Sequence, residues 1–140
     1  MRNKSATAYA HNDADTAVAS FGSTQLIVLV YDRVLDHLRV AKFSMENGGD
    51  GIEAFNKAHD LIQQGLLACL DHERGAGIAE NLNLVYEWSL REILAARLDR
   101  NLERLDQVME ILADLREAWS HMSSGDEESN SAIEVTKSLN

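Results

Sequence analysis

The five histidines are the first residues to examine for chemistry, because histidine is a common metal ligand and general base. A di-iron centre in a helical bundle uses Glu-x-x-His motifs, in which an acid precedes the histidine by three positions. The residues at those positions in this chain are Ala8, Val34, Asn56, Cys69 and Ala118. None of them is acidic, so the spacing excludes that di-iron motif.

Other catalytic signatures are also missing from the sequence. His72-Glu73 begins a zinc-protease-like pattern, but Ala76 stands where the pattern requires its second histidine. The chain has no Gly-x-Ser-x-Gly motif and no phosphate-binding glycine loop. We therefore predict that the protein is not an enzyme and uses neither a metal nor another cofactor.

The single cysteine, Cys69, has no partner for a disulfide within the chain. Its neighbours Leu66, Leu67 and Leu70 are apolar, and a thiol buried in apolar surroundings is unreactive. We predict that Cys69 is a small buried residue.

The composition indicates one helical domain. The 140 residues include no proline and only 6% aromatics, which favours long helices over turn-rich β-structure. The formal net charge of −10 weighs against nucleic acid or an anionic membrane as a partner, because both attract basic patches. There is no apolar signal core near the N-terminus and no apolar run of membrane-spanning length. We expect a cytoplasmic protein that does not insert into a membrane.

Residues 26–46 are the stretch around which the other segments are expected to pack. Apolar residues recur there every three or four positions, which is the period of one helix face. The recurring residues are Ile27, Val30, Val34, Leu38, Ala41 and Met45. Residues 26–31 are apolar all the way round, so other helices or a partner must cover this helix on several sides. Ser23 or Thr24 is the expected N-cap, and the glycines at 48 and 49 are expected to end the helix.

Two further helices are expected in the middle of the chain. The second begins at a capping box formed by Asp50 and Glu53 and runs to about Leu70. A break containing two glycines separates it from the third helix, which runs from about Ile78 to Leu98. The predicted core face of the third helix consists of Ile78, Leu82, Val85, Ser89, Ile93 and Ala96.

The fourth helix follows the polar break at 99–101 and has a coiled-coil-like seam. The seam residues are Leu105, Val108, Leu112, Leu115, Trp119 and Met122. Helices with short connections favour an all-α, antiparallel up-down four-helix bundle. We expect an N-terminal arm or short helix over 1–22, the bundle over 23–122 and a disordered acidic tail over 123–140.

The first and third helices carry more apolar surface than one core face uses. Taken singly, Tyr31, Tyr86 and Trp88 are best interpreted as core or boundary residues. Taken together, the surplus allows a groove between helices that accepts an apolar helix from another chain.

Five motifs, in order between residues 6 and 122, resemble those of FliS, the flagellar secretion chaperone family. They are Ala8-Tyr9-Ala10, the helix from Gln25 to Asp32, Ile62-Gln63-Gln64-Gly65-Leu66 followed by Leu70-Asp71, the segment from Gly75 to Trp88, and Glu117-Ala118-Trp119. The chain departs from the family pattern at a few positions. Gly22-Ser23 replaces Ser-Pro, Arg33 replaces a glycine, Glu92 replaces an arginine and Arg97 replaces an asparagine.

The resemblance implies a cytoplasmic chaperone that binds the disordered C-terminal segment of flagellin in apolar grooves. Such a chaperone prevents premature polymerisation and hands flagellin to the flagellar type III export apparatus, and the resemblance implies no nucleotide or metal. The N-terminal arm, anchored by Tyr9, is expected to occupy part of the groove when flagellin is absent. The expected groove residues are Ile27, Val30, Tyr31, Leu35, Leu82, Val85, Tyr86 and Trp88.

The competing hypothesis is a helical adaptor or regulator with no role in export. It would bind another flagellar protein or an anti-sigma factor, or form a homodimer. Both hypotheses use the same surplus of apolar helix surface, so the residues alone leave them open.

Overall fold

The computed structural model describes residues 23–73 and 76–139, with side chains over 24–73 and 77–123. The described part consists of α3 (Ser23–Glu46), α4 (Ile52–Leu61), the π-helical segment η1 (Ile62–Leu67), α5 (Ala76–Leu98) and α6 (Leu102–Leu139). No strand occurs within these ranges, so the predicted all-α class is confirmed. The predicted N-terminal arm, with Tyr9, lies outside the described residues.

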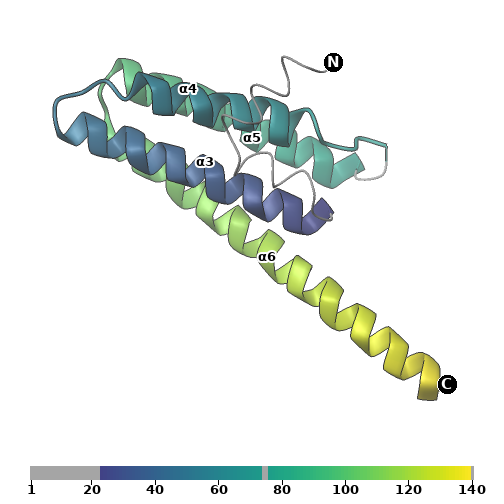
Figure 1. Ribbon diagram of the computed structural model, residues 1–140. Helices are drawn as coiled ribbons and strands as arrows, with labels where there is room; N and C mark the ends of the chain where they lie inside the picture. The colour runs from purple at the N-terminus through teal and green to yellow at the C-terminus, as the bar shows by residue number, and fades with distance from the viewer. Residues whose placement is uncertain (1–22, 74–75, 140) are drawn as a thin grey trace, which may run out of the picture.

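The helices form an antiparallel up-down bundle (Figure 1). Helix α3 packs against α4 on one side and α6 on the other, and α5 packs against α4, η1 and α6. Helices α3 and α5 are not neighbours and therefore lie diagonally across the bundle. The C-terminal half of α6 runs beyond the other helices (Figure 1).

The corner between α3 and α4 begins with the helix end that the glycine pair predicts. The Gly49 N–H donates to the Ser44 carbonyl at 2.7 Å, and the Gly48 N–H donates to the Met45 carbonyl at 3.2 Å. With Gly48 at φ 87°, this pair of bonds is a Schellman motif. The predicted end of the first helix is confirmed.

The start of α4 differs from the predicted capping box. The N-cap residue is Gly51, at φ 63°, and not Asp50. The Asp50 carboxylate accepts from the Ile52 N–H at 3.1 Å, so Asp50 still contributes to the cap from one position earlier. Glycine is required at 51 because its φ is positive and because a Cβ there would lie 3.0 Å from the Ala41 carbonyl oxygen. This packing against α3 is not visible in the local sequence pattern.

The second predicted helix, expected to reach about Leu70, changes its hydrogen bonding on the way. The α-helix ends at Leu61 and continues as the π-helical η1 to Leu67. The Ala68 N–H donates to the Gln63 carbonyl at 3.0 Å, five residues back rather than four. The chain then leaves the helix through a turn, so residues 68–70 belong to the connection to α5.

The corner between α5 and α6 is also a Schellman motif, but Arg100 takes the left-handed position at φ 51°. The Asn101 N–H donates to the Ala96 carbonyl at 2.8 Å, and the Asn101 side chain accepts from the Arg104 N–H at 3.0 Å. The Arg100 guanidinium donates to the Gly49 carbonyl at 3.1 Å. This bond joins the two corners at the same end of the bundle.

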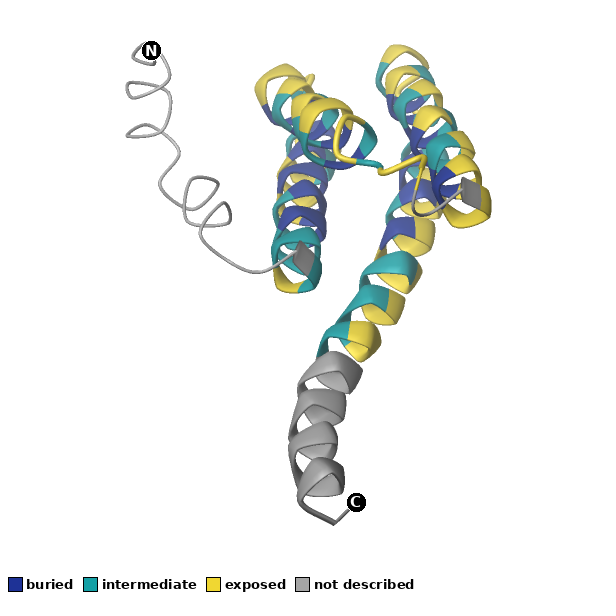
Figure 2. Cartoon of the chain, turned by 90° about the vertical axis from the view of Figure 1, so that its right-hand side faces the viewer, coloured by how far each residue is buried: buried dark blue, intermediate teal, exposed yellow. Residues whose placement is uncertain are grey.

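The core is continuous along the faces where the four helices meet (Figure 2). Of the predicted fourth-helix seam, Leu105, Val108 and Leu112 are fully buried, whereas Met122 is 53% exposed. The assignment of Ile78 to the core face of the third helix is wrong, since this side chain is 70% exposed.

Helix α6 continues to Leu139 through the segment for which the composition predicts a disordered tail. The side chains from residue 124 onward lie outside the description, and the domain boundary at 123 stays a prediction.

Candidate functional site

Two tyrosines meet at the centre of the bundle. The hydroxyl oxygens of Tyr31 on α3 and Tyr86 on α5 lie 2.6 Å apart, and both side chains are buried. The ring centroids are 6.2 Å apart at an interplanar angle of 54°. This hydrogen bond connects the two diagonal helices, whose backbones make no contact.

Burial raises the pKa of both hydroxyls above the usual tyrosine value, because the phenolate would be poorly solvated. The pKa of Tyr31 is raised further because a second phenolate beside that of Tyr86 would be repelled, and because Tyr31 is hydrogen-bonded to Tyr86. Hydrogen bonding by Trp119 on α6 lowers the pKa of both hydroxyls and so partly offsets the effect of burial. Each hydroxyl therefore stays protonated and can donate at neutral pH.

The predicted groove residues fall into two sets. The buried set consists of Val30, Tyr31, Leu35, Leu82 and Tyr86. The partly exposed set consists of Ile27, Val85 and Trp88. These exposures describe the chain without a partner. That either set contacts flagellin stays a prediction.

A groove of about 450 Å³ opens between η1 and α5. Ile27, Leu82 and Tyr86 line it, so the structure brings these three predicted residues together. The other five predicted residues do not line it.

The remaining lining residues were not among the predicted groove residues. They are Gly65, Leu66, Cys69, Leu70, Asp71, Ile78, Ala79 and Trp119. Most come from η1, the connection after it and the first turn of α5. The motif from Ile62 to Asp71 was the available signal, but nothing local to it indicates that the connection folds against α5.

The prediction that Cys69 is buried is wrong. Its side chain is exposed at the groove, and Sγ lies 3.7 Å from the Gln64 carbonyl oxygen, to which the thiol donates a weak hydrogen bond. The physical reason is the end of η1 at Leu67, after which Cys69 leaves the apolar stripe of a regular helix.

Ion pairs connect α6 to α3 and to α5. The Arg116 guanidinium donates to both carboxylate oxygens of Asp32 on α3, at 2.8 and 3.3 Å. This contact raises the pKa of Arg116. Glu92, where the family pattern has an arginine, lies 2.9 Å from Arg104 on α6. The acidic residue is thus used in an α5–α6 contact.

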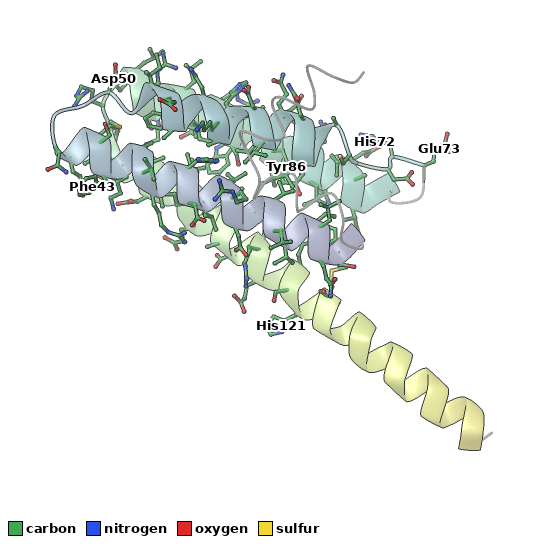
Figure 3. All side chains as sticks on the ribbon, viewed as in Figure 1. Phe43, Asp50, His72, Glu73, Tyr86 and His121 are labelled. Carbon is green, nitrogen blue, oxygen red and sulfur yellow. The ribbon has the colours of Figure 1, made fainter. Side chains whose placement is uncertain are left out.

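A second hollow of about 550 Å³ lies at the other end of the bundle, near the α3–α4 corner. His37, Val40 and Ile52 are among its lining residues, and none of the predicted groove residues is. Figure 3 shows Phe43 and Asp50 at this end, while His72 and Glu73 lie at the opposite end beside the connection after η1. The two hollows are therefore separate features.

The described residues offer little for metal chemistry. No group of three His, Cys, Asp or Glu side chains within them is arranged to hold a metal ion. None of the described helices combines the length and apolarity needed to cross a membrane.

The fold and the groove define a class: a small antiparallel helical bundle with an open apolar groove at one end. Comparison with known proteins assigns the chain to a family. The model of the family described as flagellar protein FliS matches residues 5–126. The chain belongs to the FliS family.

Relatives of the chain carry the name of this family. The flagellar secretion chaperone FliS of Salmonella typhimurium is 35% identical over 119 residues, which are 83% of this chain and 87% of the relative. The Escherichia coli protein of the same name is 30% identical with the same coverage. The Vibrio cholerae protein is 27% identical over 82% of this chain and 85% of its own length. Membership of this family of flagellar secretion chaperones supports a role in flagellar export.

Proposed function

We propose that the chain is a cytosolic export chaperone for flagellin. It binds the C-terminal segment of flagellin in the groove between η1 and α5, prevents premature polymerisation, and passes flagellin to the flagellar type III export apparatus. The observation that carries the proposal is an open apolar groove of about 450 Å³ in a chain of the FliS family. The names of the relatives support the export role.

The chemistry of the groove fits an amphipathic segment. Ile27, Leu66 and Leu82 supply apolar walls from three elements, and Trp119 adds an aromatic one. A groove of this size falls in the range of about 300–1,000 Å³ that is typical of ligand sites, so it receives a few side chains of a longer segment. Burial at about 25 cal/mol per Å² of apolar area offsets the entropy lost when a flexible segment becomes ordered.

The exposed part of α5 extends the contact beyond the groove. Val85 and Trp88 are partly exposed and follow Leu82 along the helix, so a docked helix can continue over them. The buried residues Val30, Tyr31 and Leu35 then support the binding surface from beneath. Their direct contact with flagellin would require the helices to separate.

The N-terminal arm is proposed to compete for the same groove. Tyr9 is its anchor by resemblance to the family, and the arm lies outside the described residues. Removal of residues 1–22 is expected to increase the affinity for flagellin. An unchanged or lower affinity would contradict the competition.

Size-exclusion co-elution tests the proposed function. The chain is mixed with full-length flagellin from the same organism and, in parallel, with flagellin that lacks its C-terminal segment. We expect a complex with the full-length form alone. Absence of a complex with both forms would contradict the proposal and favour the adaptor or regulator hypothesis, whose partner a pull-down would then identify.

A further inference from the structure

The groove wall formed by η1 lies very close to α3. A Cβ atom built on Gly65 would lie 3.1 Å from Cγ1 of Val30, which is shorter than the ordinary contact distances of 3.4–4 Å. Val30 is only 7% exposed, and its β-branched side chain has one strongly preferred rotamer in a helix. Val30 therefore has little freedom to move aside, and the approach of η1 to α3 depends on the missing side chain at Gly65.

Gly65 also lies within the π-helical part of the wall. The bond from the Ala68 N–H to the Gln63 carbonyl closes a turn wider than an α-helical one. Because a π-helical turn contains more residues than an α-helical one, it changes the angular position around the helix axis of every side chain that follows. Gly65 and Leu66 line the groove directly, and Cys69 follows from the end of the same segment. The position and phase of η1 thus determine which atoms face the groove.

We propose that Gly65 is a positioning residue of the flagellin-binding groove. By lacking a side chain, it allows the π-helical η1 to rest against Val30, and this contact sets the place of the wall that carries Leu66 and Cys69. The inference rests on the proposed function, since it concerns the groove assigned there to the flagellin segment. Gly65 also lines the groove, but the role proposed here is exerted through its contact with Val30.

The first variant is Gly65→Ala in the full chain. Its added methyl group crowds Val30, which has little room to give way, so we expect η1 to shift away from α3. Affinity for a synthetic flagellin C-terminal peptide, measured by calorimetry, is then expected to fall. A loss of about tenfold is expected, which corresponds to about 1.4 kcal/mol. The matched control is Gly77→Ala in α5, where an added Cβ meets nothing within 4 Å. Both changes replace a glycine of a helical segment by alanine, but only the first adds a crowded methyl group, so the control should bind as the unchanged protein does.

A second variant makes room for the added methyl group. Val30→Ala removes the atom that the new Cβ would meet, so the double variant should bind more tightly than Gly65→Ala alone. The coupling is evaluated as a double-mutant cycle in affinity, which separates it from the loss of core packing caused by Val30→Ala. Circular dichroism and the melting temperature report the fold of all four proteins.

The rate at which Cys69 reacts with maleimide tests the role of Gly65 without flagellin. It is the chain's one cysteine, and its thiol contacts the Gln64 carbonyl at the end of η1. Displacement of η1 should loosen this contact and speed maleimide labelling in the free Gly65→Ala protein. Labelling of Gly77→Ala should keep the original rate.

The outcomes separate the two proposals. If the unchanged protein fails to bind flagellin, the proposed function is contradicted, and the labelling rates alone decide the role of Gly65. If the unchanged protein binds, and the affinity of Gly65→Ala equals that of the unchanged protein or that of Gly77→Ala, the positioning role is overturned. If Gly65→Ala unfolds, refolding of the double variant supports the close approach to Val30, and continued unfolding contradicts it.

Discussion

The hydroxyl oxygens of Tyr31 and Tyr86 lie 2.6 Å apart across the diagonal of the bundle. They connect α3 and α5, two helices that are otherwise separated by α4, η1 and α6. Both residues were predicted from the sequence to border a groove, and Tyr86 lines it from beneath. The pair therefore couples the centre of the core to the floor of the candidate site.

Tyr31→Phe is expected to destabilise the protein by about 1–3 kcal/mol, because it leaves the buried Tyr86 hydroxyl without its phenolic partner. The indole of Trp119 can only donate, so it cannot replace Tyr31 as an acceptor for the Tyr86 hydroxyl. The double variant with Tyr86→Phe should lose less than the sum of the single losses. Urea unfolding measures the three values, and strict additivity would contradict the pairing.

Stability is expected to fall steeply above pH 10. Burial raises the pKa of Tyr31 and Tyr86 in the folded state above the unfolded value of 10.0. Above that pH the unfolded state binds fewer protons than the folded state, so the free energy of unfolding decreases as pH rises. Below it, this contribution is fully present. The double phenylalanine variant should show a weaker alkaline dependence in urea unfolding, and an equal dependence would contradict the assignment.

Arg116→Ala is expected to cost about 0.2–1 kcal/mol, since its contact with Asp32 joins α3 to α6 but both side chains are partly exposed. The loss should shrink as salt is added. Arg39→Ala is the control, because Arg39 pairs with Asp36 at the surface of one helix. Thermal unfolding at low and high salt compares the two, and an equal effect of both changes would contradict a bridging role.

Ile27→Asp is expected to abolish flagellin binding while the protein stays helical, because Ile27 lines the groove and is only partly buried. Tyr31→Asp should instead unfold the protein, because it places a charge in the core. Phe43→Asp is the matched control, since Phe43 is 67% exposed at the far end of the bundle (Figure 3). Circular dichroism and calorimetric titration with the flagellin peptide distinguish the three. Loss of binding in Phe43→Asp would place the partner elsewhere.

Cys69 is expected to be protected from maleimide when a flagellin segment occupies the groove, because its exposed thiol lines that groove. Mass spectrometry of the single labelled site follows the rate with and without peptide. Protection should disappear with a peptide whose apolar residues are replaced by serine. Equal labelling rates in the free and bound protein would show that the segment does not cover Cys69.

Local sequence patterns, namely capping residues and helical periodicity, predicted the helices well. The glycine pair after Glu46 and the seam residues Leu105, Val108 and Leu112 stand in the structure as expected, because capping and helix periodicity act over a few residues. The predictions that failed concern positions where a second element intervenes. Gly51 caps α4 because it packs on Ala41 of α3, and Cys69 is exposed because η1 ends the regular helix before it.

The sequence by itself determined the all-α class, the approximate helix limits and the family motifs, since each of these is written in neighbouring residues. Only the tertiary structure decided that Tyr31 meets Tyr86, 55 positions away, and that the connection after η1 completes a groove with α5 and Trp119. Contacts between non-neighbouring helices depend on the rotation and crossing of the whole bundle. Those quantities arise from the packing of all four helices together, so no single stretch of sequence contains them.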